Sequence, residues 1–154
     1  MRQRMQKGPI PQDLVLKWML QVSVALHYLH QQHLIHRDIK PENIFIDEND
    51  NAIVGDLGLL SNRFMAGTVA GDYKYMAREI IKSQTLETPS YDSRVDVYSL
   101  GVLMAELLIG EKPPVDPFTD VEKPISYKEG VPNELIDICS GMVKKDPELR
   151  PFIY

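Results

Sequence analysis

The 154-residue chain contains one stretch, residues 35–58, in which short apolar runs alternate with clusters of polar residues. Residues 44–46 and 52–54 are apolar and β-prone, and residues 47–51 between them are rich in turn formers. This pattern predicts a β-hairpin at about 43–55. Because a hairpin reverses the chain, the polar residues on its two sides are expected to meet in space.

Four polar side chains of this stretch suit phosphoryl transfer. Asp38 can accept a hydroxyl proton, and Lys40 can neutralise a transferring phosphoryl group. The hairpin would fold Asp56 back beside Asn43, so that two oxygen ligands converge on one Mg²⁺ ion. An alternative is a polar loop beside an ordinary hairpin. Two motifs at compatible spacing, H-R-D-x-K-x-x-N and D-L-G, favour the functional interpretation.

Three helices are predicted around this stretch. Apolar residues recur at three- and four-residue intervals over 12–31 and again over 133–144, which predicts two amphipathic helices. Residues 94–109 are apolar nearly all round and predict a buried core helix. Asp96 near its start is an exception, because a buried carboxylate must be paired or hydrogen-bonded. The chain is therefore expected to be mainly α-helical with a small hairpin, an α+β fold overall.

A zinc site is an alternative interpretation of the end of the first helix. Four histidines follow one another at three-residue intervals there, and imidazoles are good zinc ligands. Three-residue steps drift by about 60° each around a helix, so the outer two diverge. No H-E-x-x-H motif is present, and the interpretation as separate histidines is favoured. The four are His27, His30, His33 and His36.

Composition excludes several classes of protein. The net charge of −5 lacks the basic excess of a nucleic-acid-binding surface. The single cysteine, Cys139, lies in an apolar helical pattern and is expected to be a buried thiol in a reducing compartment. The longest apolar run, residues 97–109, contains Glu106 and is too short to span a membrane. We expect a soluble, intracellular, cytoplasmic protein with no nucleic-acid or membrane partner.

With these motifs in place, the sequence resembles the C-terminal lobe of a eukaryotic protein kinase over nearly its whole length. H-R-D, D-L-G, M-A-R-E, D-V-Y-S-L-G-V and D-P-x-x-R-P all occur in family order. The resemblance implies a serine/threonine protein kinase that uses Mg²⁺ to transfer the γ-phosphoryl group of ATP to serine or threonine hydroxyls of protein substrates. Leu57 in place of phenylalanine is similar to the NIMA-related kinases.

The resemblance also implies roles for individual residues. Asp38 would be the catalytic base, and Lys40 would neutralise the phosphate. Asn43 and Asp56 would bind magnesium, and Phe45 would form the floor beneath ATP.

Further residues would have structural and regulatory roles. Glu79 would pair with Arg150, and Asp96 would anchor the backbone of the catalytic loop. Arg37 resembles the arginine of kinases that are regulated by phosphorylation, because a guanidinium can pair with a phosphate. The candidate acceptors in the following loop are Ser61 and Thr68; alternatively, Arg37 pairs with a local carboxylate.

The sequence departs from the family in three respects. No G-x-G-x-x-G loop, V-A-I-K lysine or partner glutamate helix is present, so residues 1–154 are expected to form a partial kinase domain without the N-terminal lobe and the last helix, poorly active in isolation. Arg78 replaces the proline of A-P-E. Asp72 stands where the family has a threonine that contacts the catalytic aspartate, unless an insertion places Thr68 there. If Asp72 fills this position, its carboxylate would repel that of Asp38.

A catalytically inactive pseudokinase or regulatory fragment, acting as a binding module, is therefore the second hypothesis for function.

Overall fold

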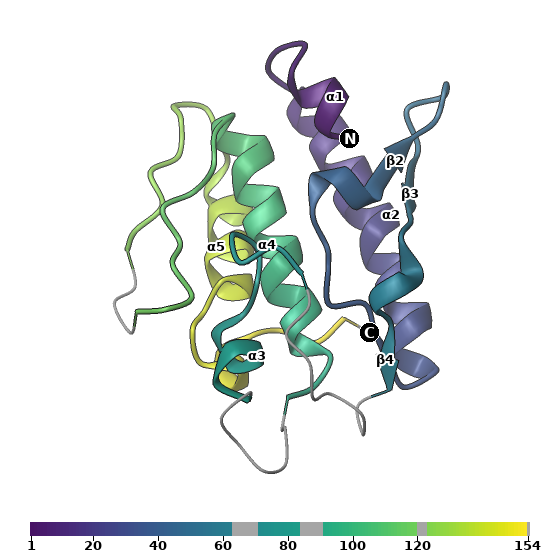
Figure 1. The fold of residues 1–154 in the computed structure, drawn as a ribbon. Helices are drawn as coiled ribbons and strands as arrows, with labels where there is room; N and C mark the ends of the chain where they lie inside the picture. The colour runs from purple at the N-terminus through teal and green to yellow at the C-terminus, as the bar shows by residue number, and fades with distance from the viewer. Residues whose placement is uncertain (63–70, 84–90, 120–122, 154) are drawn as a thin grey trace.

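A computed structural model describes residues 1–62, 71–83, 91–119 and 123–153 (Figure 1). Thr68 lies outside these ranges. The described part is rich in helix and has two small antiparallel pairs of strands, which confirms the expected fold class. Its helices and strands are α1 (Arg2–Met5), α2 (Gln12–Gln31), β1 (Leu34–Ile35), β2 (Ile44–Ile46), β3 (Ala52–Val54), β4 (Ser61–Asn62), α3 (Arg78–Lys82), α4 (Arg94–Ile109) and α5 (Asn133–Met142).

Helix α4 is the centre of the molecule, with α2 on one side and α5 on the other (Figure 1). All of its residues are buried, as its continuous apolar sequence predicts. It ends at Gly110, whose φ of 80° is the left-handed conformation that terminates many helices. The predicted bounds of this helix, 94–109, are confirmed.

Helix α2 presents one apolar face to α4, and it also has the bounds predicted from the sequence. Its buried residues are Val15, Trp18, Met19, Val22 and Leu26. The indole Nε1 of Trp18 donates a 3.0 Å hydrogen bond to the carbonyl oxygen of Asp50, in the turn between β2 and β3. Helix α2 therefore holds the hairpin in place.

The predicted hairpin is confirmed, with Phe45 paired to Ile53 at its centre. Its turn is closed by Asp47, whose Oδ1 accepts hydrogen bonds from the backbone N–H groups of Asn49 and Asn51 at 2.9 and 2.7 Å. These are the turn formers that the sequence placed between the two apolar runs.

Two predictions from the sequence need correction, one for the end of a helix and one for Ser61. Helix α5, predicted over 133–144, ends at Met142, because Val143 does not have the helical conformation. Ser61 was expected in an irregular loop, but it lies in β4 opposite Ile35 and is buried. The two-residue pairing of β1 with β4 joins the segment that precedes the hairpin to the segment that follows it.

The packing of α5 on α4 depends on Gly101. A Cβ atom added at Gly101 would lie 2.7 Å from Cβ of Met142 and 2.9 Å from Cγ1 of Val143. We expect Gly101→Ala to lower the free energy of unfolding by about 1–3 kcal/mol, because overpacking forces the two helices apart. Urea denaturation would measure the change.

Gly141 provides the matched control for this substitution. It lies in α5, and a Cβ added there has no heavy atom within 4 Å. Gly141→Ala should leave stability unchanged or raise it by up to about 1 kcal/mol, because alanine has the higher helix propensity. Equal losses for both variants would contradict the close approach at Gly101.

Candidate active site

The side chains of the H-R-D-x-K-x-x-N motif converge on Asp38. Lys40 Nζ donates to Asp38 Oδ2 at 2.8 Å, and Asn43 Nδ2 donates to the same oxygen at 2.7 Å. Asn43 Nδ2 also reaches the backbone carbonyl of Asp38 at 2.8 Å. Asp38 is only 6% exposed. The structure thus holds one nearly buried carboxylate between a cation and an amide, in a fixed orientation.

Asp96 supports this loop from below. Its carboxylate is fully buried and accepts hydrogen bonds from the backbone N–H groups of Arg37 at 2.8 Å and His36 at 2.9 Å. His30 Nε2 lies 2.8 Å from the same carboxylate. Arg37 has a φ of 69°, which is uncommon for a residue other than glycine. The buried carboxylate therefore fixes the backbone just before Asp38 in a conformation that it would otherwise avoid.

The hairpin brings the D-L-G motif to Asn43. The N–H of Gly55 donates to the carbonyl oxygen of Asn43 at 2.8 Å, and His36 Nε2 lies 3.0 Å from the carbonyl oxygen of Gly55. Asp56, the next residue, is exposed and has a φ of 53°. Its Oδ1 accepts a long hydrogen bond, 3.4 Å, from the N–H of Gly58. Gly55 and Asn43, on the two sides of the hairpin, thus meet, and Asp56 follows this contact directly in the chain.

Gly71 and Asp72 lie against the loop that carries Arg37 and Asp38. Asp72 donates its backbone N–H to Asp38 Oδ1 at 3.2 Å. A Cβ added at Gly71 would lie 2.8 Å from the carbonyl oxygen of Arg37, so only glycine allows this approach. Asp72 Oδ1 accepts from the N–H of Lys74 at 3.0 Å. The backbone of Asp72 therefore makes a favourable contact with Asp38. The sequence left two alternatives for this position, a carboxylate of Asp72 that repels Asp38 or an insertion that places Thr68 there, and neither included this contact.

Arg37 reaches towards the segment that follows D-L-G. Its side chain donates to the carbonyl oxygen of Leu59 at 2.8 Å and to the hydroxyl of Tyr91 at 3.4 Å. Ser61 is 6% exposed. In this conformation its hydroxyl is therefore not accessible to a modifying enzyme.

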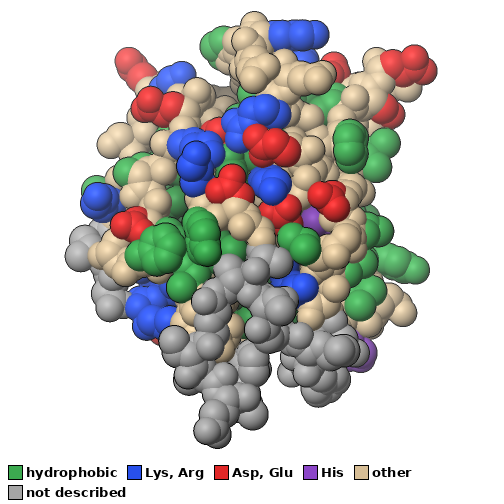
Figure 2. Space-filling view, viewed as in Figure 1, with side chains coloured by type: hydrophobic (Ala, Val, Ile, Leu, Met, Phe, Trp, Pro, Cys, Tyr) green, Lys and Arg blue, Asp and Glu red, His purple; other side chains and the backbone are tan. Residues whose placement is uncertain are grey.

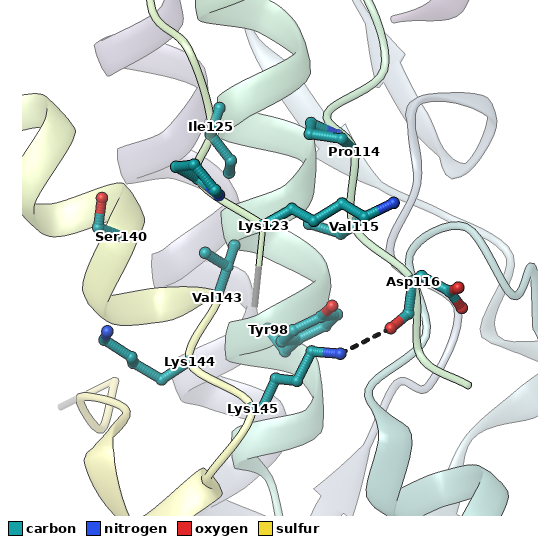
Figure 3. Close-up of a pocket in the computed structure, with 11 residues that line it drawn as sticks. Tyr98, Pro114, Val115, Asp116, Lys123, Ile125, Ser140, Val143, Lys144 and Lys145 are labelled. Carbon is teal, nitrogen blue, oxygen red and sulfur yellow. Dashed lines mark hydrogen bonds between the residues drawn. The ribbon is translucent and has the colours of Figure 1, made fainter. Parts of the chain in front are cut away.

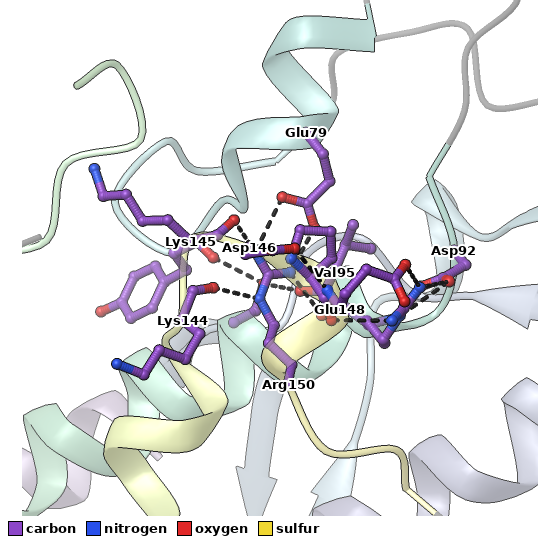
Figure 4. Close-up of polar contacts among 12 residues, drawn as sticks. Glu79, Asp92, Val95, Lys144, Lys145, Asp146, Glu148 and Arg150 are labelled. Carbon is purple, nitrogen blue, oxygen red and sulfur yellow. Dashed lines mark hydrogen bonds and ion pairs between the residues drawn. The ribbon is translucent and has the colours of Figure 1, made fainter. Parts of the chain in front are cut away.

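An ion pair ties α3 to the end of the described chain (Figure 4). Arg150 binds Glu79 through two contacts of 2.5 and 3.1 Å, and the Arg150 side chain is fully buried. Its guanidinium also donates to the carbonyl oxygens of Lys144 and Lys145, at 2.6 and 3.1 Å. Tyr98 lies beneath it, with 4.9 Å between the guanidinium carbon and the ring centre. These contacts make the arginine a fixed joint between α3 and the end of α5.

A second charged network, which no sequence motif predicts, lies beside the site. The Arg2 guanidinium donates to Glu42 Oε1, Glu106 Oε1 and the Tyr75 hydroxyl, each at 2.6 Å, and Tyr75 also donates to Glu106. Burial, together with the hydrogen bond to Glu106, raises the pKa of Tyr75. Glu106 is an acid in a wholly buried helix, as Asp96 is, and this signal alone predicts a partner.

Lysine, arginine and acidic side chains gather across the middle of the face drawn in Figure 2, in front of α4 and the hairpin.

Phe45 is 57% exposed and lines a cavity of about 530 Å³ between α1 and β2. Its ring occupies the space that a Cβ on Gly55 would fill, with Cε2 2.2 Å from that position. The absence of a side chain at Gly55 therefore allows an aromatic ring to lie over the start of D-L-G.

Three of the four histidines of the alternative zinc interpretation have separate side-chain partners. His30 contacts Asp96 and His36 contacts Gly55, whereas His27 Nδ1 lies 3.3 Å from the carbonyl oxygen of Ile153. Over residues 1–62, 71–83, 91–119 and 123–153, no three acidic, histidine or cysteine side chains form a group that could hold a metal ion.

Cys139 is fully buried, as predicted, and burial raises the pKa of its thiol to about 11. None of the helices in the described ranges has the length and apolar character needed to cross a membrane.

The sequence that forms this site is similar to sequences of known proteins. The sequence model of the protein kinase domain family matches residues 1–153 of this chain. The chain belongs to the protein kinase family. Its relatives include an Aurora kinase of Candida glabrata, 36% identical over 93% of this chain and 41% of that protein, and the serine/threonine-protein kinase STY17 of Arabidopsis thaliana, 35% identical over 94% of this chain and 26% of that protein.

The dual specificity mitogen-activated protein kinase kinase 7 of Homo sapiens is 39% identical over 79% of the chain and 30% of that protein. The chain thus spans 26–41% of the length of these three curated relatives. Family membership accounts for the presence of H-R-D, D-L-G and M-A-R-E in one order, and the names of the relatives include both serine/threonine and dual-specificity kinases.

Proposed function

We propose that the chain is the C-terminal catalytic lobe of a serine/threonine protein kinase that transfers the γ-phosphoryl group of ATP to protein hydroxyls. The observation that carries this proposal is the shared contact of Lys40 and Asn43 with Asp38 Oδ2, at 2.8 and 2.7 Å. A structural role alone gives no reason to gather a cation, an amide and a carboxylate at one nearly buried position.

Asp38 would accept the proton of the attacking hydroxyl. Its Oδ1 receives one N–H and its Oδ2 receives two side-chain donors, so the carboxylate is oriented before substrate arrives. Lys40 would then place its ammonium beside the phosphoryl group as charge develops. The exposed ring of Phe45 offers an apolar surface beneath the nucleotide base.

Two residues fit a Mg²⁺ site. Mg²⁺ is commonly held by one or two protein oxygens together with substrate phosphates and waters. The amide nitrogen of Asn43 donates to Asp38, which leaves its amide oxygen as the acceptor. The exposed Asp56 follows Gly55, whose backbone N–H donates to the carbonyl oxygen of Asn43. Bound Mg²⁺ would neutralise charge on the phosphate oxygens.

The chain can be tested directly by incubation with Mg-ATP and a mixture of serine, threonine and tyrosine peptides. We expect slow incorporation of phosphate into serine and threonine only. Incorporation into tyrosine would refute the proposed specificity, and no incorporation by this chain or by a longer protein that contains it would refute the enzyme.

Asp72 favours a second candidate, a kinase-fold binding module without turnover. We expect Asp72→Thr to raise phosphoryl transfer by roughly 10- to 100-fold, because a hydroxyl donor to the charged Asp38–Lys40 pair adds one charge-assisted hydrogen bond. Peptide phosphorylation would be measured for the two proteins side by side.

Asp72→Asn is the control, since it removes the charge without supplying a hydroxyl. A gain confined to Asp72→Thr supports an active site that lacks one donor. If neither substitution changes the rate, Asp72 does not limit catalysis; if the Asn variant gains as much as the Thr variant, charge repulsion is the cause.

A further inference from the structure

A cavity of about 280 Å³ lies between α4, the end of α5 and the segments 114–116 and 123–125 (Figure 3). Val115 and Val143 pack on the hydrophobic cluster that contains Tyr98, whereas Ile125 packs on the larger cluster around α2. The cavity therefore lies where two hydrophobic clusters meet. Its apolar wall consists of Tyr98, Pro114, Val115, Pro124, Ile125 and Val143. Its volume is near the lower end of small-molecule sites, which range over roughly 300–1,000 Å³.

The charges around this cavity oppose the charge of the whole protein. Three lysines line it together with one acid, Asp116, although the chain carries a net charge of −5. The Asp116 carboxylate is engaged, because its Oδ1 accepts a 2.9 Å hydrogen bond from the N–H of Phe118. A concave site with several cations and apolar walls attracts anions.

One lysine holds the cavity wall in place. Lys145 Nζ donates to the backbone carbonyl oxygens of Asp116, at 2.9 Å, and of Thr119. This contact fixes the segment 114–116 against the end of α5, as the dashed line in Figure 3 marks. The site is therefore formed before any ligand arrives.

The other two lysines lie at its rim. Lys123 is exposed and extends past Val115 in Figure 3, and its ammonium makes no hydrogen bond or ion pair within the part of the chain that the structure describes. Lys144 follows the last turn of α5 and is partly buried. We propose that this cavity binds a small organic anion, a carboxylate or phosphate on an apolar ring or short chain. The apolar body would lie against Tyr98, and the anionic group would meet the ammonium of Lys123, because the ammonium of Lys144 points the other way (Figure 3).

The position of the cavity gives such a ligand a route to α3. The carbonyl oxygens of Lys144 and Lys145 hold Arg150, and Arg150 binds Glu79. Tyr98 is at once a wall of the cavity and the ring beneath the Arg150 guanidinium. A ligand that displaces Tyr98 or the two lysines therefore acts on the residues that fix α3.

The test is a titration of the whole chain with phenyl phosphate, followed by ¹H–¹⁵N NMR. It needs no ATP, so it is independent of catalysis. We expect saturable shifts at Val115, Ser140 and Val143, and smaller ones at the Nε–H of Arg150. Benzylammonium carries a similar ring with the opposite charge, and it should not shift these resonances.

Substitutions at the rim make the test specific. Lys123→Gln should weaken phenyl phosphate binding by about tenfold, the effect of losing one charge-assisted hydrogen bond, and Lys123→Arg should retain most of the affinity. Lys7→Gln, an exposed lysine at another cavity, should have no effect. Equal binding of benzylammonium, an equal loss in Lys7→Gln, or the absence of saturable shifts at these three residues would overturn the proposal.

Discussion

Replacing Asp38 with asparagine is expected to lower the rate of phosphoryl transfer by about 10²–10⁴-fold, the usual contribution of a general base. Asparagine has the same shape but cannot accept the proton of the attacking hydroxyl. It also loses the 2.8 Å ion pair with Lys40, which then has no fixed position beside the phosphate. Single-turnover transfer to a serine peptide would measure the effect.

Two comparisons separate the loss of chemistry from a loss of structure. Asp137→Asn changes an exposed carboxylate on α5 and should leave the rate unchanged. The unfolding midpoint of the Asp38 variant should stay close to that of the unmodified chain, because the substitution leaves the packing as it is. A rate that falls by less than tenfold would show that Asp38 is not the base.

Asp96→Ala is expected to be the most destabilising substitution near the site. The backbone N–H groups of His36 and Arg37 would lose their acceptor in the interior, and each unsatisfied buried group costs about 1–3 kcal/mol. The sum, roughly 2–6 kcal/mol, is a large part of the 5–15 kcal/mol that typically stabilises a domain. Urea unfolding followed by circular dichroism would measure it.

Asp96→Asn retains one carbonyl oxygen and should lose less stability than alanine. Asp13→Ala, which truncates an exposed acid in the first turn of α2, is the surface control. An Asp96→Ala variant as stable as the Asp13→Ala variant would mean that water replaces the carboxylate, and that the loop does not depend on it.

The long elements of the fold could be predicted because their signals are local. The apolar face of α2 and the continuous apolar run of α4 are visible within each segment, and Gly110 marks the end of α4. Strand β4 could not be predicted, since its two residues pair with Leu34 and Ile35, almost thirty residues earlier. Nothing in the local sequence around Ser61 reveals that pairing.

The same distinction applies to the site. The spacing of Asp38, Lys40 and Asn43 predicted a cluster that the structure contains, because all three lie in one loop. The donor from Asp72 to Asp38 is a backbone N–H, which no side-chain pattern reports. The contact of Arg2 with Glu106 spans 104 positions, so a basic residue near the start of the chain gave no indication of its partner.

The pairing of Arg150 with Glu79 has a consequence for synthesis on the ribosome. The two residues are 71 positions apart. At about 5–20 residues per second, the arginine is added roughly 4–14 s after the glutamate. During that interval α3 lacks the side chain that fixes it, and Glu79 is hydrated. A nascent chain halted between the two residues should therefore have a folded hairpin and a protease-sensitive α3.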